Sequence, residues 1–272
     1  MIETSKSIQL WNTICSILNS RLPKWRDRIN KGGQVSAVEA RENGYQFFDK
    51  EVFEGIVKAV LSNSTDWSKI ERVLPELHKL FHDFDIGFYS GLTAQDVIRD
   101  FLPWFENRWA GSLTMKQSLT SLIETAKQLC EYSQRFGSLD RYFISLLKMC
   151  NNDAVTLVEK LGSPKSKYKL PAMGLAIAAE ALKNIGFDVA KPDRHINRAV
   201  GSFKFVSFSK WPDRSERKPP QCSEKDLIEV MRAMDRFATS VGVRVSFLDN
   251  AIWLLCCKSG LYLSNQQLSK LM

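Results

Sequence analysis

The turn Leu170-Pro171-Ala172-Met173-Gly174 constrains the fold of this chain more than any other segment. Pro171 fixes a backbone dihedral angle and Gly174 lets backbone approach closely, so the segment predicts a tight turn that opens a helix. The helix predicted over residues 175–184 is rich in alanine, which allows a neighbouring helix to pack close. Such a turn leaves amides unpaired at the start of the helix, where they attract phosphate.

Helical periodicity dominates the rest of the chain, and the period-two alternation of strands is absent from the sequence. Thr93 and Asp96 predict the start of a helix that ends near Trp104, and Ser223 and Ser246 are possible caps of the two closing helices. Helices are also predicted over residues 6–20, 50–62, 115–134, 138–149, 153–161, 223–240 and 246–258. The sequence therefore predicts an all-α fold.

Composition and charge indicate the class of protein and the kinds of partner it could bind. The 272 residues are 44% hydrophobic and 25% charged, which is ordinary for a globular protein. The net charge of +8 is compatible with nucleic acid, and equally with simple solubility. The six cysteines are scattered, so neither a zinc site nor an iron–sulfur cluster is expected. Without a signal peptide or an apolar run of about 20 residues, we expect a cytoplasmic protein with no membrane partner.

A second motif, Lys191-Pro192-Asp193-Arg194-His195, follows the alanine-rich helix. It places one carboxylate between a proline and a basic residue. A fixed carboxylate suits a cation that develops during a reaction. Asp193 can equally be the N-cap of the next helix, and one residue can do both.

The two motifs together resemble the helix-hairpin-helix DNA glycosylase superfamily, the endonuclease III-like base-excision enzymes. In that family a Leu-Pro-Gly-x-Gly hairpin precedes a helix and a Val-Asp-x-His segment that carries the catalytic aspartate. Leu170, Pro171 and Gly174 match the hairpin, and Asp193 and His195 match the second segment. Residues 59–66 resemble the first barrel helix and its exit, and residues 248–254 resemble a closing helix.

The resemblance implies two helical lobes that flank a DNA-binding cleft. A helical barrel domain over residues 50–186 would end in the hairpin, and residues 1–49 and 187–272 would form a second domain that carries Asp193. The implied partner is double-stranded DNA with a modified base, bound by a monomer. The base would flip into a pocket, and Asp193 would stabilise the cationic sugar while the glycosidic bond is hydrolysed.

Two departures from the family pattern refine this expectation. Ala172 replaces the first glycine of the hairpin, and Ala176 stands where bifunctional members carry the Schiff-base lysine. Because alanine cannot form an imine, the resemblance implies a monofunctional glycosylase without β-lyase activity. No cofactor is required, and the resemblance makes the backbone carbonyls of Tyr168, Leu170 and Met173 candidate ligands for K⁺ or Na⁺.

Further residues are candidates to contact DNA or the flipped base. Asn63 matches the region that fills the gap left by that base, although it could also be a helix C-cap. His195 is expected to be packed. The candidates for DNA contact are Asn63, Lys165, Lys167, Lys169, Ala172, Gly174, Leu175, Ala176 and Arg194. The candidates for the base pocket are three aromatic residues, Tyr45, Phe48 and Trp104.

Several hypotheses on function stay open. The leading one is a glycosylase that removes a damaged base, with alkylated purines as the default target because they leave readily. The same chemistry could excise a hypermodified phage base in antiviral defence. The alternatives are a non-catalytic DNA-binding protein that kept the hairpin, and a helical interaction protein whose hairpin resemblance is accidental.

Overall fold

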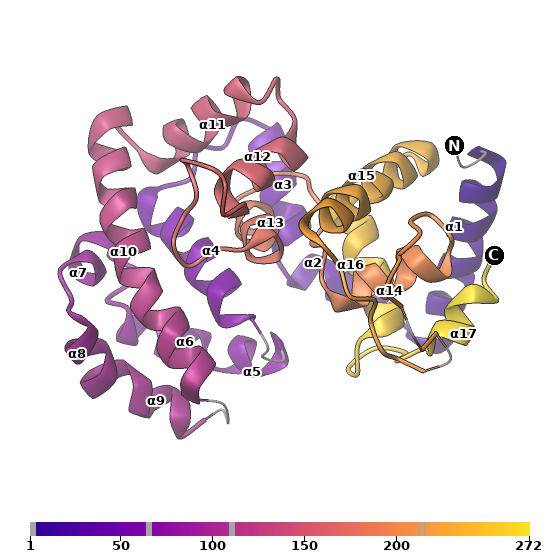
Figure 1. The fold of residues 1–272 in the computed structure, drawn as a ribbon, viewed down its shortest axis with the longest axis horizontal. Coiled ribbons are helices and arrows are strands. Elements are labelled where there is room, and N and C mark those ends of the chain that lie inside the picture. Colours follow the sequence, from indigo (N-terminus) through magenta and orange to yellow (C-terminus); the bar gives the residue numbers. More distant parts are fainter. Residues whose placement is uncertain (1–3, 64–66, 109–111, 212, 215) are drawn as a thin grey trace. The chain divides into compact units, whose positions relative to one another are not determined.

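The structure is a computed structural model that describes residues 4–63, 67–108, 112–211, 213–214 and 216–272. Every regular element in these ranges is helical, which confirms the predicted all-α fold. The chain divides into two compact units, whose course can be followed in Figure 1. Unit 1 comprises Met1–Asn43 and Gly186–Met272, and unit 2 comprises Gly44–Ile185. None of the described helices is long and apolar enough to cross a membrane.

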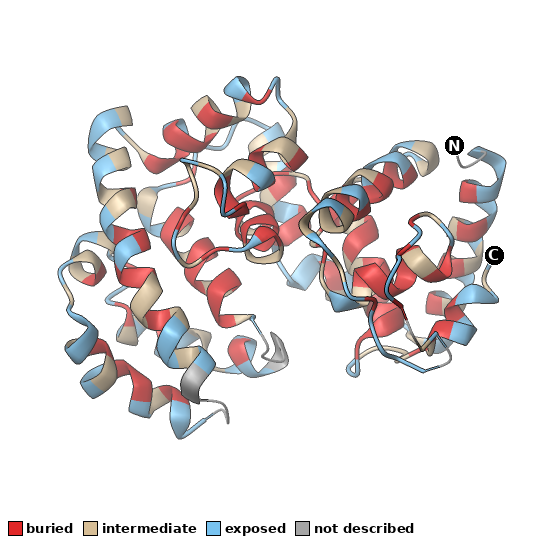
Figure 2. Ribbon diagram, viewed as in Figure 1, coloured by how far each residue is buried: buried red, intermediate tan, exposed pale blue. Residues whose placement is uncertain are grey.

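Unit 2 is organised around helix α4 (Asp49–Leu61), which contacts α7, α10, α11 and α13. The apolar face expected of this helix is buried, including Phe53, Ile56 and Val60 (Figure 2). The remaining helices of the unit are α5 (Trp67–Arg72), α6 (Leu74–Leu80), α7 (Ile86–Ser90), α8 (Ala94–Asp96), the π-helical turn η1 (Val97–Phe101), α9 (Leu102–Glu106), α10 (Ser112–Phe136), α11 (Leu139–Met149), α12 (Ala154–Gly162) and α13 (Leu175–Asn184).

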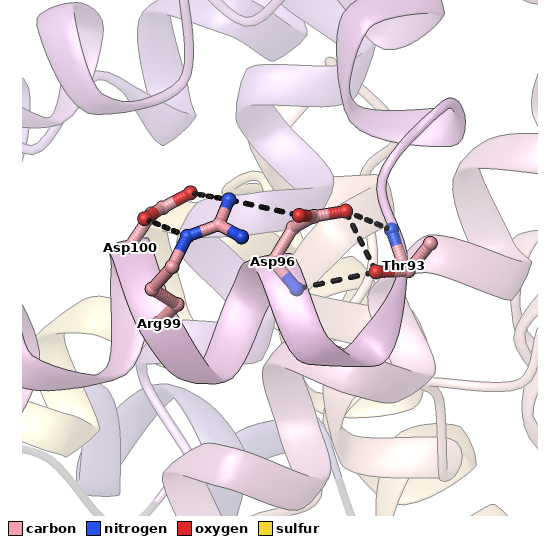
Figure 3. Close-up of polar contacts among 4 residues, drawn as sticks. All are labelled: Thr93, Asp96, Arg99 and Asp100. Carbon is pink, nitrogen blue, oxygen red and sulfur yellow. Dashed lines mark hydrogen bonds and ion pairs between the residues drawn. The ribbon is translucent and has the colours of Figure 1, made fainter.

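Helix α8 begins at the cap that the sequence predicts (Figure 3). Thr93 Oγ1 accepts from Asp96 N at 3.2 Å, and Asp96 Oδ2 accepts from Thr93 N at 2.9 Å. The hydrogen bonds from Thr93 hold the pKa of the Asp96 carboxyl below its usual value. Arg99 links Asp96 to Asp100 with N–O distances of 2.9 and 2.6 Å. This reciprocal cap fixes the start of the α8–η1–α9 run.

Unit 1 packs around helix α16 (Val245–Cys256), which contacts α1, α2, α3, α14 and α15. Most of α16 is buried, including Leu248, Ile252 and Leu255 (Figure 2). The other helices of the unit are α1 (Thr4–Arg21), α2 (Trp25–Lys31), α3 (Gln34–Glu42), α14 (Arg194–Ser202), α15 (Glu224–Val241) and α17 (Asn265–Ser269).

The start of α16 is capped from a distant segment, and not by Ser246 as the local sequence favours. Asp188 accepts hydrogen bonds from Val245 N at 2.9 Å and from Ser246 N at 2.7 Å. A carboxylate at a helix N-terminus also interacts favourably with the helix dipole. The segment that leads toward Asp193 is thereby fixed to the central helix of unit 1.

Candidate functional site

A hairpin joins α12 to α13, and a glycine at the end of α12 lets the two helices meet. Asp153 caps the start of α12 by accepting from Val155 N at 3.0 Å. At the other end, a Cβ on Gly162 would lie 2.8 Å from Leu175 N and 2.9 Å from the carbonyl carbon of Gly174. Backbone atoms cannot yield as a flexible side chain can, so this crossing requires glycine.

Hydrogen bonds fix the turn between the two helices. Leu170 and Met173 are buried; Leu170 N donates to Leu161 O at 3.0 Å, and Met173 N donates to Leu170 O at 3.0 Å. Ala172 N donates to Oγ1 of Thr125, a fully buried residue on α10, at 3.0 Å. The sequence predicts that Ala172 contacts DNA, but its amide is engaged within the protein.

No side chain in the described part of the chain caps the N-terminus of α13. Gly174 occupies the N-cap position in extended backbone and is exposed. The first hydrogen bond of the helix runs from Ala178 N to Gly174 O at 2.9 Å. The amides of Leu175, Ala176 and Ile177 precede that bond, so the helix offers them no carbonyl. Together with the positive end of the helix dipole, they form a site suited to an anion.

Three lysines precede the turn in two different environments. Lys165 and Lys167 are exposed, and Lys167 Nζ lies 5.1 Å from the ring centroid of Tyr168. Lys169 is half-buried, and its Nζ donates to Leu170 O at 3.1 Å. Burial lowers the pKa of Lys169. The two exposed ammonium groups therefore add positive charge close in sequence to the uncapped helix.

Of the carbonyls of Tyr168, Leu170 and Met173, that of Leu170 is a poor fit to the K⁺ or Na⁺ site that the resemblance implies. Leu170 O already accepts from Met173 N at 3.0 Å and from Lys169 Nζ at 3.1 Å. The ammonium places a positive charge beside the oxygen that would bind the ion, and like charges repel. Hydrogen bonds therefore hold this turn, with an ammonium where the ion was expected.

Asp193 is the N-cap of α14, and its two carboxylate oxygens differ in their contacts. Oδ1 accepts from His195 N at 2.7 Å and from Ile196 N at 3.1 Å. No residue that the structure describes donates to Oδ2. Capping thus uses one oxygen only. Because Asp193 is partly exposed, the second oxygen can meet a ligand.

Backbone hydrogen bonds hold the turn that carries Asp193. Asp193 N donates to Lys191 O at 2.8 Å, and Asn197 N donates to Asp193 O at 2.8 Å. Lys191 N donates to Oδ1 of Asp249, on α16, at 3.2 Å. Pro192 is buried between these contacts. The turn is therefore fixed both by its own helix and by the central helix of unit 1.

His195 packs beside this turn, while Arg194 is exposed. The His195 ring meets Trp253 edge-on, with a centroid distance of 6.4 Å. Its Nδ1 is buried and has no hydrogen-bond partner among the described residues. Burial lowers the pKa of His195, although the Asp193 carboxylate acts in the opposite direction. Burial thus favours the neutral form of the His195 ring, and the exposed Arg194 is a cation that can meet a phosphate.

The aromatic candidates for a base pocket lie on two segments of unit 2. Tyr45 and Phe48 precede α4 and are 42% and 65% exposed. The Glu51 carboxylate is hydrogen-bonded to both residues: it accepts from Tyr45 Oη at 2.9 Å and from Phe48 N at 2.7 Å. The bond to Glu51 raises the pKa of Tyr45. Trp104 lies on α9, with the Arg108 guanidinium 4.2 Å from its ring centroid.

The remaining candidate, Asn63, follows the end of α4. Asn63 is exposed, and its N–H donates to Val60 O at 3.2 Å. Residues 64–66, the end of the matching segment, lie outside the described residues. Asn63, the aromatic candidates and the hairpin all belong to unit 2, whereas Asp193 and Arg194 belong to unit 1.

Sequence reasoning missed three residues that shape these two turns. Gly162 directly follows the helix predicted over residues 153–161, but its role in the crossing depends on contacts distant in sequence. Thr125 lies in a helix with many polar residues, and nothing nearby distinguishes it. Asp249 does carry a signal, because a carboxylate inside an apolar helix must find a partner when it is buried.

Solved structures identify the fold. The 8-oxoguanine DNA glycosylase of Thermotoga maritima superimposes with a TM-score of 0.58 at 16% identity, covering 92% of this chain and 96% of its own. The Methanocaldococcus jannaschii 8-oxoguanine glycosylase/lyase, solved with a 15mer DNA containing 8-oxoguanine, gives 0.56 at 18% identity, covering 90% and 95%. The chain has the fold of the 8-oxoguanine DNA glycosylases.

This glycosylase fold is the one implied by the hairpin resemblance, and the all-helical architecture agrees with it. No protein-family model matches the sequence, and no curated protein matches it significantly. At 16–18% identity the likeness establishes the architecture. The chemistry must be argued from the two turns themselves.

Proposed function

We propose that this protein is a monofunctional DNA glycosylase that hydrolyses the N-glycosidic bond of a modified nucleotide and leaves an abasic site. The contacts of Asp193 support this proposal most directly. One of its oxygens is fixed by two backbone amides, while the other is not engaged by any described residue. A carboxylate held in this way can stabilise a cationic sugar and orient the attacking water.

The uncapped start of α13 would bind a phosphate of the DNA backbone. The amides of Leu175, Ala176 and Ile177, together with exposed Lys165 and Lys167, supply the donors and charge that such an anion needs. A complex of a protein with the same fold and a 15mer DNA supports DNA as the partner. DNA binding that weakens steeply with salt is expected.

The proposed substrate is a modified purine. Alkylated purines are the default from leaving-group chemistry, because a cationic base departs without much electrophilic help. The structural relatives favour a second candidate, since the two proteins above act on 8-oxoguanine. A hypermodified phage base would require the same Asp193 chemistry with a different pocket.

The absence of lyase activity rests on residue 176. Ala176 has no amine in the first turn of α13, and Lys183 at the far end of that helix pairs with Glu180 at 3.3 Å. Without an amine that attacks the sugar, water is the nucleophile and the DNA strand remains intact. The relative from Methanocaldococcus jannaschii is a glycosylase/lyase, so this property would separate the two proteins.

The test is base release under single-turnover conditions, followed by mass spectrometry, from duplexes carrying alkylated purines, 8-oxoguanine or hypermodified phage bases. Wild type should leave abasic sites in one of them, and Asp193→Asn should be slower by about 100- to 1000-fold. Asparagine caps helices as well as aspartate, so the variant keeps its fold. Wild type without release from any duplex, or an equally active variant, would contradict the proposal.

Borohydride trapping tests the monofunctional part separately. Wild type should form no covalent adduct with a substrate duplex, because no imine forms. A trapped adduct would overturn this part alone, and Lys169→Ala and Lys191→Ala would then identify the amine. Salt-dependent binding without base release would instead favour the non-catalytic DNA-binding alternative.

A further inference from the structure

Asp249 is a carboxylate in the core of unit 1. It lies on α16 between apolar turns and is 3% exposed. Burying an ionised carboxylate is costly unless its oxygens accept hydrogen bonds. Asp249 Oδ1 accepts from Lys191 N at 3.2 Å, which directs it toward the segment that carries Asp193.

The bond from Asp249 is the first of several that run along this segment. The N–H of Lys191 donates to Asp249, and the carbonyl oxygen of Lys191 accepts from Asp193 N at 2.8 Å. Pro192 O accepts from Asn197 Nδ2 at 3.3 Å, and Asp193 O accepts from Asn197 N at 2.8 Å. Helix α14 thus holds the turn from one side, and Asp249 holds it from α16.

Helix α16 also contacts His195, two residues after Asp193. Trp253 lies one turn after Asp249 on α16, and its ring meets His195 edge-on with centroids 6.4 Å apart. Two side chains at this spacing share one face of a helix. That face of α16 therefore contacts the chain two residues before Asp193 and two residues after it.

We propose that Asp249 is a positioning residue that sets the backbone of Lys191–Asp193, so that the second oxygen of Asp193 faces the reacting sugar. This inference rests on the proposed function. A hydrogen bond to an ionised acceptor is stronger than one between neutral groups. A catalytic group displaced by about 1 Å can lose about 100-fold in rate.

The experiment compares Asp249→Ala with Asp249→Asn in single-turnover base release and in DNA binding by the full chain. Alanine removes the acceptor and should slow release by about 10- to 100-fold with the Kd for DNA unchanged. Asparagine keeps an oxygen that can accept from Lys191 N and should restore most of the rate. Ser223→Ala, which removes the N-cap of α15 in the same unit, is the matched control and should not change the rate.

A second readout does not need substrate: amide hydrogen exchange at Lys191. Exchange should accelerate in Asp249→Ala and stay near wild type in Asp249→Asn. An alanine variant with wild-type rate and wild-type exchange would overturn the inference, as would an asparagine variant as slow as alanine. Wild type that releases no base would overturn the proposed function instead, and exchange at Lys191 would still decide whether Asp249 holds the turn.

Discussion

The turns that lead into α13 and α14 both end at a helix N-terminus, but the two N-termini are capped differently. Gly174 precedes α13 without a side chain, so the first-turn amides are left to an external anion. Asp193 precedes α14 and binds two amides with its own carboxylate. Both helices carry the positive end of their dipole at this point. The N-cap residue alone therefore decides whether the helix end recruits an anion or holds one that belongs to the protein.

Gly174→Asp would convert the first turn into a copy of the second, and we expect it to have the largest effect. The residue has extended backbone and a Cβ there meets nothing within 4 Å, so aspartate fits without strain. The new carboxylate would cap α13 and repel phosphate. The Kd for duplex DNA should rise by about tenfold or more, since like charges at an interface cost several kcal/mol.

Gly174→Ala is the control for that change, because it adds the Cβ without the charge. Fluorescence anisotropy with labelled duplex measures both variants, and only the aspartate should weaken binding strongly. Equal affinities for the two variants would show that the N-terminus of α13 does not face phosphate.

Gly162→Ala tests the close packing of the end of α12 against the start of α13. The new Cβ would press on backbone atoms of Gly174 and Leu175, which lie within 3 Å. Overpacking of this kind costs about 1–3 kcal/mol. Urea unfolding should show that loss, with weaker DNA binding. Unchanged stability would mean that the two helices can separate without consequence.

Thr125→Val tests the support of the turn from α10. The substitution keeps the shape but leaves Ala172 N without its acceptor, at a cost of about 1–3 kcal/mol. Thr120→Val is the matched control, because among the described residues the Thr120 hydroxyl bonds only to backbone carbonyls of its own helix. Thermal unfolding should separate the two variants, and equal losses would remove Thr125 from this role.

The smallest effect concerns His195, beside the capped end. Burial lowers its pKa below the usual 6.5, so the unfolded chain takes up this proton first as the pH falls. The contribution of neutral His195 to the free energy of unfolding is therefore fully present above pH 6.5. It is lost as the pH falls from there through the lowered pKa of the folded state. Thermal unfolding between pH 7.5 and 5 should therefore show a smaller loss for His195→Gln than for wild type. Parallel curves would show that His195 titrates alike in both states.

The sequence predicted the features of the two units that depend on local residue patterns. Amphipathic spacing located α4, and Thr93 with Asp96 located the start of α8. The hairpin resemblance implied the glycosylase architecture that the structural relatives share. These features follow from residues within one or two helical turns of each other, which is the range over which spacing is informative.

Contacts between distant segments were beyond that range. Asp188 caps α16, Thr125 accepts from Ala172 N, and Lys169 places an ammonium on Leu170 O. Each depends on which helices pack together or on how one side chain turns within a loop. Periodicity carries neither kind of information, so the partners of Ala172 N and Leu170 O could not be predicted from the sequence.

The central claim is that the uncapped turn binds DNA and the capped turn does the chemistry. Measuring both the Kd for substrate duplex and the saturating single-turnover rate in Gly174→Asp and Asp193→Asn tests it most directly. The account predicts a crossed result: Gly174→Asp loses affinity and keeps its rate at saturation, while Asp193→Asn keeps affinity and loses its rate. Two variants that lose affinity and rate together, or an Asp193→Asn variant with wild-type rate, would contradict it.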